Sequence, residues 1–595
     1  MGIATGGVRH GHSALPMVFV FLSSWAMAAN ADSHLEGGTS VIVGKAADGS
    51  GQPVPHAMVT ISGNPLPATS VTVFTDEKGE YRFRAGDLGA GLKVNELDVT
   101  CQKLGYHKSK KKVATSPSNS PARVDCLLTA ANNVADEVPA SAWLGMTPNT
   151  MARDITTKQC VQCHQLPFNG AKVIAASTKA QSTEDREALW RGIVTYMRQM
   201  SNHVAGLASR RRFENRSTDW RSNPDEAFLN AGDEDIIAPF LAKYLPTDFS
   251  YFDPEKYVDP SPVGAKGTVI HTYYIEPSAN GWYREVMVSK QSPYVWGVDL
   301  GQDRMLKLDP SSGEYRWLNI PGKGPMGPHT ITPDADGNLW VSLEEIAGLG
   351  IFDPKTEKWK IFADVLEPGL VSHDFATDSQ GQVALDQKGR AWITIVSGNN
   401  FAAFDPQTGK VEYYELPERA DGSKAPTLPY GTAMTRDGKH VWFSQHNADV
   451  VGSLNTETGK VDFVQKLPTG TAPRRMQISD DDVLWVALSG SSQLLEVNTR
   501  TKKFKVHDLP DRASSPYNAV WDPVRKVVWV GTTNADKIYR FDPKVNAFTQ
   551  YPLPHAGAYL RMLSIDPKSG DLWTIYANKT GAKAPTFVIK LSLDE

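Results

Sequence analysis

The chain has 595 residues, a length that predicts roughly three to five domains. Its hydrophobic content of 41%, its charged content of 22% and its 48 glycines and 39 prolines are typical of a globular, turn-rich protein, and they exclude a disordered or collagen-like chain. The 62 basic and 66 acidic residues leave a net charge of −4, so the chain lacks the global basic field of nucleic-acid-binding proteins, and nucleic acid is not an expected partner.

The N-terminus has the order of features found in secretory signal peptides. An apolar stretch from Ala14 to Leu22 is followed by small residues ending in Ala29-Asn30-Ala31. This order predicts a signal peptide over residues 1–31 with an A-x-A cleavage site. Because the apolar run is short and contains Pro16, it argues against a retained membrane helix. We therefore expect a bacterial protein that is periplasmic or secreted and has no transmembrane segment after cleavage.

Residues 38–130 alternate apolar and polar positions in short runs separated by turns, which predicts a β-sandwich. The phrases Gly51-Gln52-Pro53-Val54-Pro55 and Thr75-Asp76-Glu77-Lys78-Gly79 resemble the carboxypeptidase regulatory-like (transthyretin-like) sandwich family. Cys101 and Cys126 both fall in this region. Export favours a disulfide between facing strands, and two free thiols are the alternative.

The next region contains Cys160-Val161-Gln162-Cys163-His164, a C-x-x-C-H motif that is typical of covalent c-type haem attachment. Each thiol can add to a haem vinyl group, and the adjacent imidazole can bind the iron. A zinc site would need two further soft ligands near the motif, and a thioredoxin-type pair would need a βαβ context. The surrounding pattern is helical instead: an amphipathic stretch opens at Glu184 with Ser182 or Thr183 as N-cap, and a second runs from Glu234 to Leu245.

Residues 150–248 resemble the class I cytochrome c family, with the haem motif first and a helix at the end. The resemblance implies one covalent haem c, with Cys160, Cys163 and His164 as its attachment and ligand residues. It also implies a sixth iron ligand, usually methionine and sometimes histidine. Met197, Met200 and His203 are the candidates for this ligand, and a core position on the helix face is the alternative for each methionine.

Residues 262–595 repeat a phrase built around seven tryptophans. Their spacings are 44, 52, 50, 43, 44 and 44 residues, and a turn such as Asp336-Gly337-Asn338 precedes several of them. Four short strands per repeat predict a seven-bladed β-propeller, which leaves no long unpaired edge. The strand near Val269 has no tryptophan and is expected to complete the last blade. The seven residues, interpreted as blade packing, are Trp296, Trp340, Trp392, Trp442, Trp485, Trp529 and Trp573.

This repeat resembles the propeller of streptogramin (virginiamycin B) lyases. In that family a histidine and a glutamate serve metal binding and proton abstraction, and His329 with Glu344 or Glu345 is the nearest match. Gly327 stands where a further acid would be sought, which is a departure from the lyase pattern. A divalent metal in the propeller is one implication of the resemblance.

Loops before the innermost strands line one mouth of a propeller channel, so equivalent repeat positions can be compared. These positions are rich in histidine, tyrosine and arginine, which predicts an active site at the mouth; a structural ring of hydrogen bonds is the alternative. The positions are Tyr294, His329, His373, Tyr430, Arg474, Arg475, Tyr517, Asn518, Tyr559 and Arg561, and the candidate catalytic residues are His329, His373, Tyr430, Arg475, Arg561 and Glu344.

Together these patterns predict a multidomain, mainly β protein with a transthyretin-like sandwich, a small all-α cytochrome c domain and a seven-bladed propeller. The favoured function is electron transfer by an exported haem oxidoreductase whose propeller binds a small molecule or a partner, with a soluble redox protein or a quinone-linked chain as the electron partner. The alternatives are a lyase-like enzyme with an accessory cytochrome and a non-enzymatic binding or scaffold protein.

Overall fold

The computed structural model describes residues 40–63, 68–88, 96–114, 121–207, 232–253, 259–278, 281–367, 370–420, 422, 427–577 and 586–594, without the side chains of residues 199–207. The chain divides into two units at Thr39, and the described residues all belong to the second, Ser40–Glu595, which is compact. The expected signal peptide, residues 1–31, lies outside the described residues. All three further regions expected from the sequence belong to the second unit. None of the helices in the described ranges is both long and apolar enough to cross a membrane.

Residues 40–128 form two sheets that share one hydrophobic core. The strands are β1 (Ser40–Asp48), β2 (Met58–Ser62), β3 (Ser70–Phe74), β4 (Glu80–Arg84), β5 (Leu97–Gln102), β6 (Ser109–Val113), β7 (Ala122–Arg123) and β8 (Cys126–Leu128). One sheet joins β1 to β4, β7 and β8, and the other has the order β3-β2-β5-β6. Because burial alternates along β4 and β2, Phe83 from one sheet and Val59 from the other enter the same core. A disulfide joins Cys101 of β5 to Cys126 of β8 and links the two sheets.

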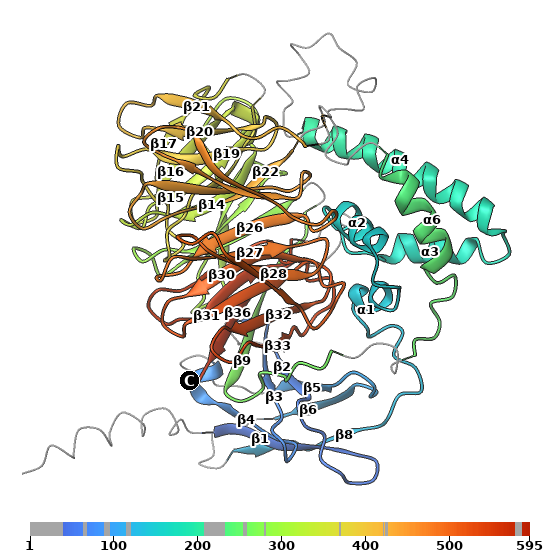
Figure 1. Cartoon of the computed structure of the whole chain (residues 1–595). Helices are drawn as coiled ribbons and strands as arrows, with labels where there is room; N and C mark the ends of the chain where they lie inside the picture. The colour runs from blue at the N-terminus through green and yellow to red at the C-terminus, as the bar shows by residue number, and fades with distance from the viewer. Residues whose placement is uncertain are drawn as a thin grey trace, which may run out of the picture. The chain divides into compact units, whose positions relative to one another are not determined.

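A group of helices follows, shown to the right in Figure 1: α1 (Ala140–Gly145), α2 (Met151–Cys160), α3 (Asn169–Ser177), α4 (Thr183–Leu207) and α6 (Glu234–Tyr244). The start of α4 agrees with the expected cap, because the Ser182 hydroxyl accepts a hydrogen bond of 3.1 Å from the backbone N–H of Asp185. Trp190 and Val194 on its apolar face are buried, and α4 packs on α6. The C-x-x-C-H motif begins at the last residue of α2.

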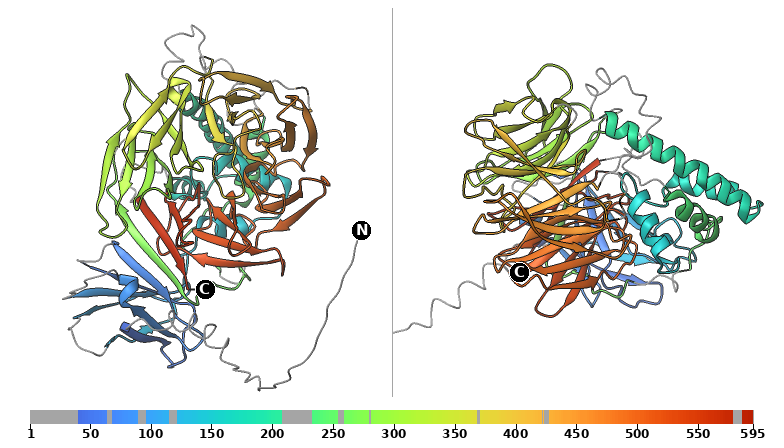
Figure 2. Two further views of the ribbon diagram at one scale, coloured as in Figure 1. Left: turned by 90° about the vertical axis from the view of Figure 1, so that its left-hand side faces the viewer. Right: turned by 45° about the horizontal axis from the view of Figure 1, so that its top comes forward.

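The remaining strands form the seven four-stranded antiparallel blades of a β-propeller, six as separate sheets and the seventh within a larger sheet, and the blades follow one another around a ring in the left view of Figure 2. The first strands of successive blades contact one another, so they are the innermost. Blades one to three are β10 (Tyr283–Val288), β11 (Val295–Asp299), β12 (Arg304–Leu308) and β13 (Tyr315–Asn319); β14 (Pro328–Pro333), β15 (Leu339–Leu343), β16 (Gly348–Asp353) and β17 (Lys358–Phe362); β18 (Ser372–Phe375), β19 (Ala391–Ile395), β20 (Asn400–Phe404) and β21 (Val411–Glu415).

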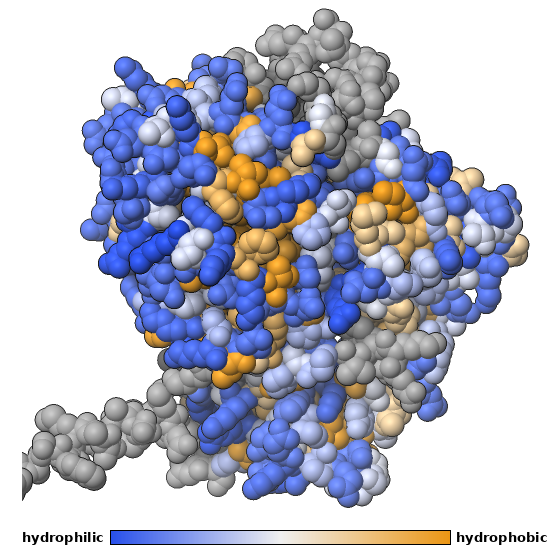
Figure 3. Space-filling model, viewed as in Figure 1, coloured by the Kyte–Doolittle hydropathy of each residue, from blue (hydrophilic) through white to orange (hydrophobic). Residues whose placement is uncertain are grey.

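Blades four to six continue the same pattern. They are β22 (Pro429–Met434), β23 (His440–Gln445), β24 (Val450–Asn455) and β25 (Val461–Lys466); β26 (Pro473–Ile478), β27 (Val483–Leu488), β28 (Gln493–Asn498) and β29 (Phe504–Asp508); β30 (Pro516–Asp522), β31 (Val527–Thr532), β32 (Lys537–Asp542) and β33 (Ala547–Pro552). The fourth strands are partly exposed, and hydrophilic residues dominate the surface around β17 and β21 in Figure 3.

The seventh blade combines strands from both ends of the propeller sequence. It contains β34 (Ser564–Ile565), β35 (Leu572–Ile575), β36 (Thr586–Leu593) and β9 (Thr268–Ile275). β9 pairs with β36 along all eight of its residues, from Thr268 opposite Leu593 to Ile275 opposite Thr586. This pairing confirms that the strand without a tryptophan completes the last blade. β9 also pairs with β3, so the last blade and one N-terminal sheet form a continuous eight-stranded sheet.

The seven tryptophans all lie in the second strand of their blades and are buried. Several of them are also tied to the turn that precedes them. The indole N–H of Trp392 donates to Asp386 at 2.9 Å, and that of Trp340 donates to Asp334 at 3.1 Å. The repeated Asp-x-x-Gly turn therefore orients the indole, and the tryptophans serve as blade packing.

Candidate functional site

The innermost strands place their second residue at one end of the propeller channel. In six blades this residue is Arg284, His329, His373, Tyr430, Arg474 or Tyr517; we call these six residues the channel ring. Each of these strands changes register against its neighbour just after its first residue. Such β-bulges redirect side chains and are common beside active sites.

Hydroxyl groups two residues after the blade tryptophans hold these bulges in place. Ser444 accepts a hydrogen bond from the N–H of Gly431 at 2.9 Å and donates to the carbonyl of Arg474 in the next blade at 2.8 Å. Thr394 likewise accepts from Asp374 at 3.0 Å and donates to the carbonyl of Tyr430 at 2.8 Å. The same short phrase that packs each blade therefore also fixes the neighbouring ring residues.

His329, His373 and Tyr430 form a stack of rings. The ring centroids of the two histidines are 4.5 Å apart, and those of His373 and Tyr430 are 4.2 Å apart. Burial lowers the pKa of His373 from 6.5 to about 4, although Asp374 opposes this shift. Burial and then Arg284 hold the pKa of His329 well below 6.5. Both imidazoles are therefore neutral near pH 7 and can accept a proton.

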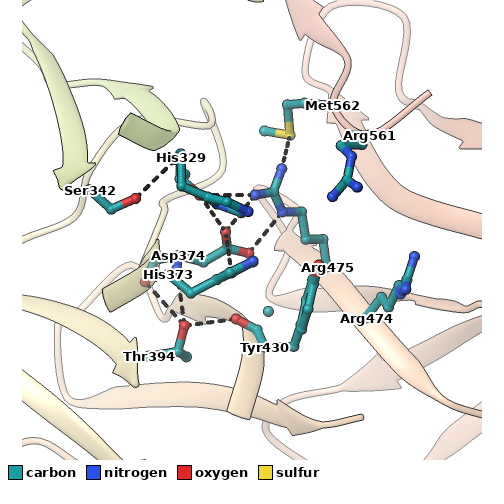
Figure 4. Close-up of polar contacts among 12 residues, drawn as sticks. His329, Ser342, His373, Asp374, Thr394, Tyr430, Arg474, Arg475, Arg561 and Met562 are labelled. Atoms are coloured by element: carbon teal, nitrogen blue, oxygen red, sulfur yellow. Dashed lines mark hydrogen bonds and ion pairs between the residues drawn. The ribbon is translucent and has the colours of Figure 1, made fainter. Parts of the chain in front are cut away.

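Arg475 is held by two buried carboxylates, of which Figure 4 labels Asp374. Its guanidinium donates to Asp374 at 2.7 and 3.0 Å and lies 2.5 Å from Glu285. It also donates to the Thr330 hydroxyl at 3.1 Å. Nδ1 of His373 lies 3.0 Å from the same Asp374 carboxylate but makes no hydrogen bond of good geometry. The carboxylate of Asp374 thus links the arginine to the histidine stack.

A second group surrounds Tyr517. Its hydroxyl hydrogen-bonds with that of Tyr430 and accepts a bond of 3.0 Å from Arg561. The Arg474 guanidinium lies 4.3 Å from the centre of the Tyr517 ring. Burial raises the pKa of Tyr517, but the guanidinium groups led by Arg561 and Arg474 outweigh burial and bring this pKa below 10. Positive charge is therefore concentrated on this side of the channel.

Glu344 follows β15 in a short 3₁₀ turn (Glu344–Ile346) and is buried beside the histidines. Its carboxylate lies 3.7 Å from Nδ1 of His329. Burial raises the pKa of Glu344 from 4.5 to about 8, against the opposing field of Arg284. At neutral pH this side chain is mainly a protonated acid next to a neutral base. Among the described residues, no group of three or more His, Cys, Asp or Glu side chains forms a metal site.

The C-x-x-C-H motif forms a turn after α2, with Cys160 half-buried and Cys163 exposed. Nδ1 of His164 donates to the carbonyl of Gln165 at 2.8 Å, because a carbonyl can only accept. Burial lowers the pKa of His164, which favours the neutral ring. The neutral ring then carries its lone pair on Nε2. Covalent haem c requires two thiols for its thioether bonds and an imidazole nitrogen for its iron. Cys160, Cys163 and Nε2 of His164 are such groups, so the residues present fit haem c.

This motif lies against the propeller, close to the candidate channel residues. The Tyr559 hydroxyl donates to the carbonyl of Val161, between the two cysteines, at 2.7 Å. Asn534 accepts from the N–H of Leu166 at 2.9 Å and donates to the carbonyl of Leu166 at 3.2 Å. Arg561, two residues after Tyr559, is close enough to Cys163 for the two groups to interact electrostatically. The motif and the channel group therefore form neighbouring parts of one region.

The structure brings His329, His373, Tyr430, Arg475, Arg561 and Glu344 together, and their catalytic role stays a prediction. It does not place Tyr294 with them. Tyr294 precedes the second strand of its blade and packs near Trp296, because the innermost strand of that blade begins eleven residues earlier, at Tyr283. Met197 is 36% exposed on α4, whereas the side chains of Met200 and His203 lie outside the described residues.

Sequence reasoning missed Arg284, Glu285 and Asp374. A usable signal was present, because His329, Tyr430, Arg474 and Tyr517 each precede a blade tryptophan by 11 or 12 residues. The same interval counted back from Trp296 reaches Glu285 and Arg284. Asp374 follows the ring residue His373 directly. The interval from the tryptophan therefore supplies Arg284, which the composition of loops missed, although it does not apply to His373, which lies 19 residues before Trp392.

Comparisons with known proteins agree with a propeller. The family model described as "SMP-30/Gluconolactonase/LRE-like region" matches residues 286–520. A streptogramin B lyase structure is 18% identical, with a TM-score of 0.45, over 55% of this chain and 98% of that chain. Two structures of virginiamycin B lyase from Staphylococcus aureus are also 18% identical, over 55% of this chain and 99% of theirs. The selenomethionine-substituted protein has a TM-score of 0.45, and a catalytically inactive histidine-to-alanine variant with quinupristin has a TM-score of 0.44.

A comparison with curated proteins finds no significant match. Residues 286–520 are similar to the SMP-30/Gluconolactonase/LRE-like region, and the repeated four-stranded sheets show that they form part of a propeller.

Proposed function

We propose that this protein is an exported c-type haem oxidoreductase whose propeller channel binds a small-molecule substrate. Cys160 and Cys163 would hold the haem through thioether bonds, and Nε2 of His164 would be its proximal ligand. When bound, a haem of this kind exchanges single electrons with donors and acceptors. Met197, Met200 and His203 remain the candidates for the sixth ligand, and a soluble redox protein or a quinone-linked chain remains the expected electron partner.

One observation carries this proposal: the haem motif is docked beside the channel group. The hydrogen bond from Tyr559 to Val161 joins the turn between the two cysteines to the same loop that carries Arg561. Lys158, two residues before Cys160, donates to the carbonyl of Asn447 at 3.3 Å and lies 3.4 Å from Asp449 in the fourth blade. A substrate in the channel would therefore lie close to the motif without any domain movement.

The channel residues supply the proton chemistry that an oxidation needs. A hydroxyl or amine group that loses electrons also becomes more acidic, and a neutral imidazole nearby can take its proton. His373 is neutral at pH 7, and the Asp374 carboxylate 3.0 Å from its Nδ1 would stabilise the imidazolium once it forms. Arg475 holds this carboxylate in position through two hydrogen bonds. His373 would thus act as the base and Asp374 as its positioning residue.

Lyase-like chemistry is a second candidate, favoured by Glu344. An acid with a pKa of about 8, 3.7 Å from the neutral His329, has the pairing expected for proton abstraction and return in an elimination. In this case the substrate would be consumed with no change in the redox state of the protein. The haem region would then be accessory to the propeller.

The test begins with the full chain expressed in a host that matures c-type cytochromes. We expect one haem that resists acid-acetone extraction and is absent from the Cys160→Ala/Cys163→Ala variant. Reduction of the oxidised haem band is then screened against small alcohols, phenols and amines. His373→Ala should abolish this reduction with an unchanged haem spectrum, whereas His440→Ala, at a partly exposed ion pair outside the channel, should not.

Absence of covalent haem in the purified protein would refute the proposal. Consumption of a substrate that requires Glu344 but leaves the haem band unchanged would instead support the lyase-like candidate.

A further inference from the structure

The channel contains buried arginines that lack carboxylate partners. Arg474 is 2% exposed and Arg561 is 4% exposed, yet no described carboxylate lies within ion-pair distance of either guanidinium. Nε and Nη1 of Arg474 and Nε of Arg561 and of Arg284 make no hydrogen bond. Buried charges in proteins are normally paired, so each unpartnered guanidinium needs an explanation.

Arg475 shows what a satisfied arginine looks like at the same depth. Its guanidinium hydrogen-bonds to Asp374 and forms an ion pair with Glu285. In Figure 4 it contacts Asp374 beside His373, whereas Arg474 and Arg561 stand apart from that network. Because Arg475 already engages Asp374 and Glu285, and Glu344 is mainly protonated near pH 7, these groups do not neutralise the other two guanidinium groups.

The Tyr517 ring holds the guanidinium groups of Arg474 and Arg561 in position and leaves N–H donors of both arginines unbonded. The centre of the Tyr517 ring lies 4.3 Å from the Arg474 guanidinium and 5.4 Å from that of Arg561. Contacts with an aromatic face orient a guanidinium plane and leave its N–H edge available. Arg561 uses one nitrogen on the Tyr517 hydroxyl, and its Nε remains unbonded.

We propose that Arg474 and Arg561, with Arg284 contributing charge, form a carboxylate-binding site in the channel. A guanidinium edge matches a planar carboxylate in shape and charge, and burial strengthens the pairing. The carboxylate has two possible sources: a free organic acid, which would be the substrate, or a propionate of the haem attached at the motif beside Arg561. The inference rests on the proposed function for the role of the acid, but the binding can be measured without any redox reaction.

The experiment is isothermal titration calorimetry of the full-length haem-loaded protein with benzoate, and with benzamide as a neutral analogue of the same shape. The same titrations are made on the Cys160→Ala/Cys163→Ala variant, which cannot carry haem. If the source is a free acid, the haem-loaded protein binds benzoate in preference to benzamide. Arg474→Gln and Arg561→Gln each weaken this binding by about tenfold or more.

If the source is a haem propionate, only the variant without the cysteines binds benzoate. In that case Arg561→Gln lowers the midpoint potential of the haem-loaded protein, because the oxidised haem loses a repelling positive charge. Either result supports a carboxylate site and identifies its source. Equal or absent binding of benzoate and benzamide in both proteins, with an unchanged potential in Arg561→Gln, would overturn the proposal.

Two further measurements separate this site from general effects on folding or charge. Arg500→Gln, at an arginine whose side chain is 76% exposed, should leave benzoate binding unchanged. Removing an unpaired buried charge should not lower the melting temperature of the ligand-free protein, so Arg474→Gln should melt at the wild-type temperature or above. If Arg474→Gln does not fold, Arg474→Lys, which keeps the charge but loses the planar edge, supplies the binding measurement.

Discussion

The buried pair of Lys158 and Asp449 offers a direct test of how the helical segment is held on the propeller. Lys158 belongs to α2, and Asp449 lies in the turn before β24. Their side chains are 3% and 4% exposed, and the ammonium nitrogen lies 3.4 Å from both carboxylate oxygens. Burial lowers the pKa of Lys158, and Asp449 is the main group that counteracts this.

We expect Lys158→Met to weaken this docking by about 3 kcal/mol. Removing one partner of a buried ion pair costs about 3 to 5 kcal/mol, because the other charge stays behind. We use the lower end of this range because two backbone hydrogen bonds still stabilise the Asp449 carboxylate after Lys158 is removed. They come from the N–H groups of Ala472 at 2.8 Å and Gly470 at 3.2 Å. Such a loss corresponds to an increase of about a hundredfold in the population with α2 detached.

Hydrogen exchange of the α2 amides, residues 151–160, measures this opening. Lys179→Met is the matched control, since Lys179 pairs with Asp248 at the surface and lies 66% exposed. The control should leave exchange unchanged. The double variant Lys158→Met/Asp449→Asn should recover most of the loss, because it leaves no unpaired charge. Equal exchange in Lys158→Met and Lys179→Met would refute the argument that the pair is buried and that it docks the helix.

Two further predictions concern the channel. Glu344 has a folded-state pKa of about 8 against an ordinary value of 4.5, so its stabilisation of the fold is complete below pH 4.5 and is lost as the pH rises through 8. Melting temperatures measured from pH 5 to 9 should therefore fall more steeply for wild type than for Glu344→Gln, and parallel curves would contradict the raised pKa. Ser444→Ala should cost about 2 kcal/mol in urea unfolding, because it leaves a buried N–H and a buried carbonyl unpaired. Ser311→Ala, in an exposed turn, is its control, and equal midpoints for the two variants would show that the Ser444 bridge is not needed.

The propeller could be predicted because every blade has the same packing requirement, which leaves a repeated pattern in the sequence. Each blade needs one large side chain on its second strand, so the tryptophan spacing alone predicts seven sheets. The pairing of β9 with β36 followed from the strand near Val269 that had no tryptophan. The error at Tyr294 came from the first blade, where no histidine or tyrosine marks the second position of the innermost strand. Arg284 occupies that position, and only the interval to Trp296 would have indicated it.

The docking of the haem motif on the channel could not be predicted from the sequence. It depends on single polar contacts between residues far apart in the chain: 291 residues separate Lys158 from Asp449, and 398 separate Val161 from Tyr559. No periodicity marks such pairs, since each residue is an ordinary lysine, aspartate or tyrosine in its own segment. Likewise, the sequence could not show that Arg474 and Arg561 lack carboxylate partners, because this depends on which carboxylates Arg475 engages.

The pairing of β9 with β36 limits the order in which the parts of this protein can assemble during synthesis. Its partner β36 lies 311 to 325 residues further along the chain, so the ring cannot close until nearly the whole sequence has emerged. The turn with Cys160 and Cys163 emerges before β9, whereas Tyr559, which later covers this turn, emerges close to the end. Cys160 is thus made before the residue that later packs beside it, and it is half-buried in the closed protein, whereas Cys163 stays exposed. A covalent reaction at Cys160 is therefore least hindered before the ring closes, and slower closure would give it more time.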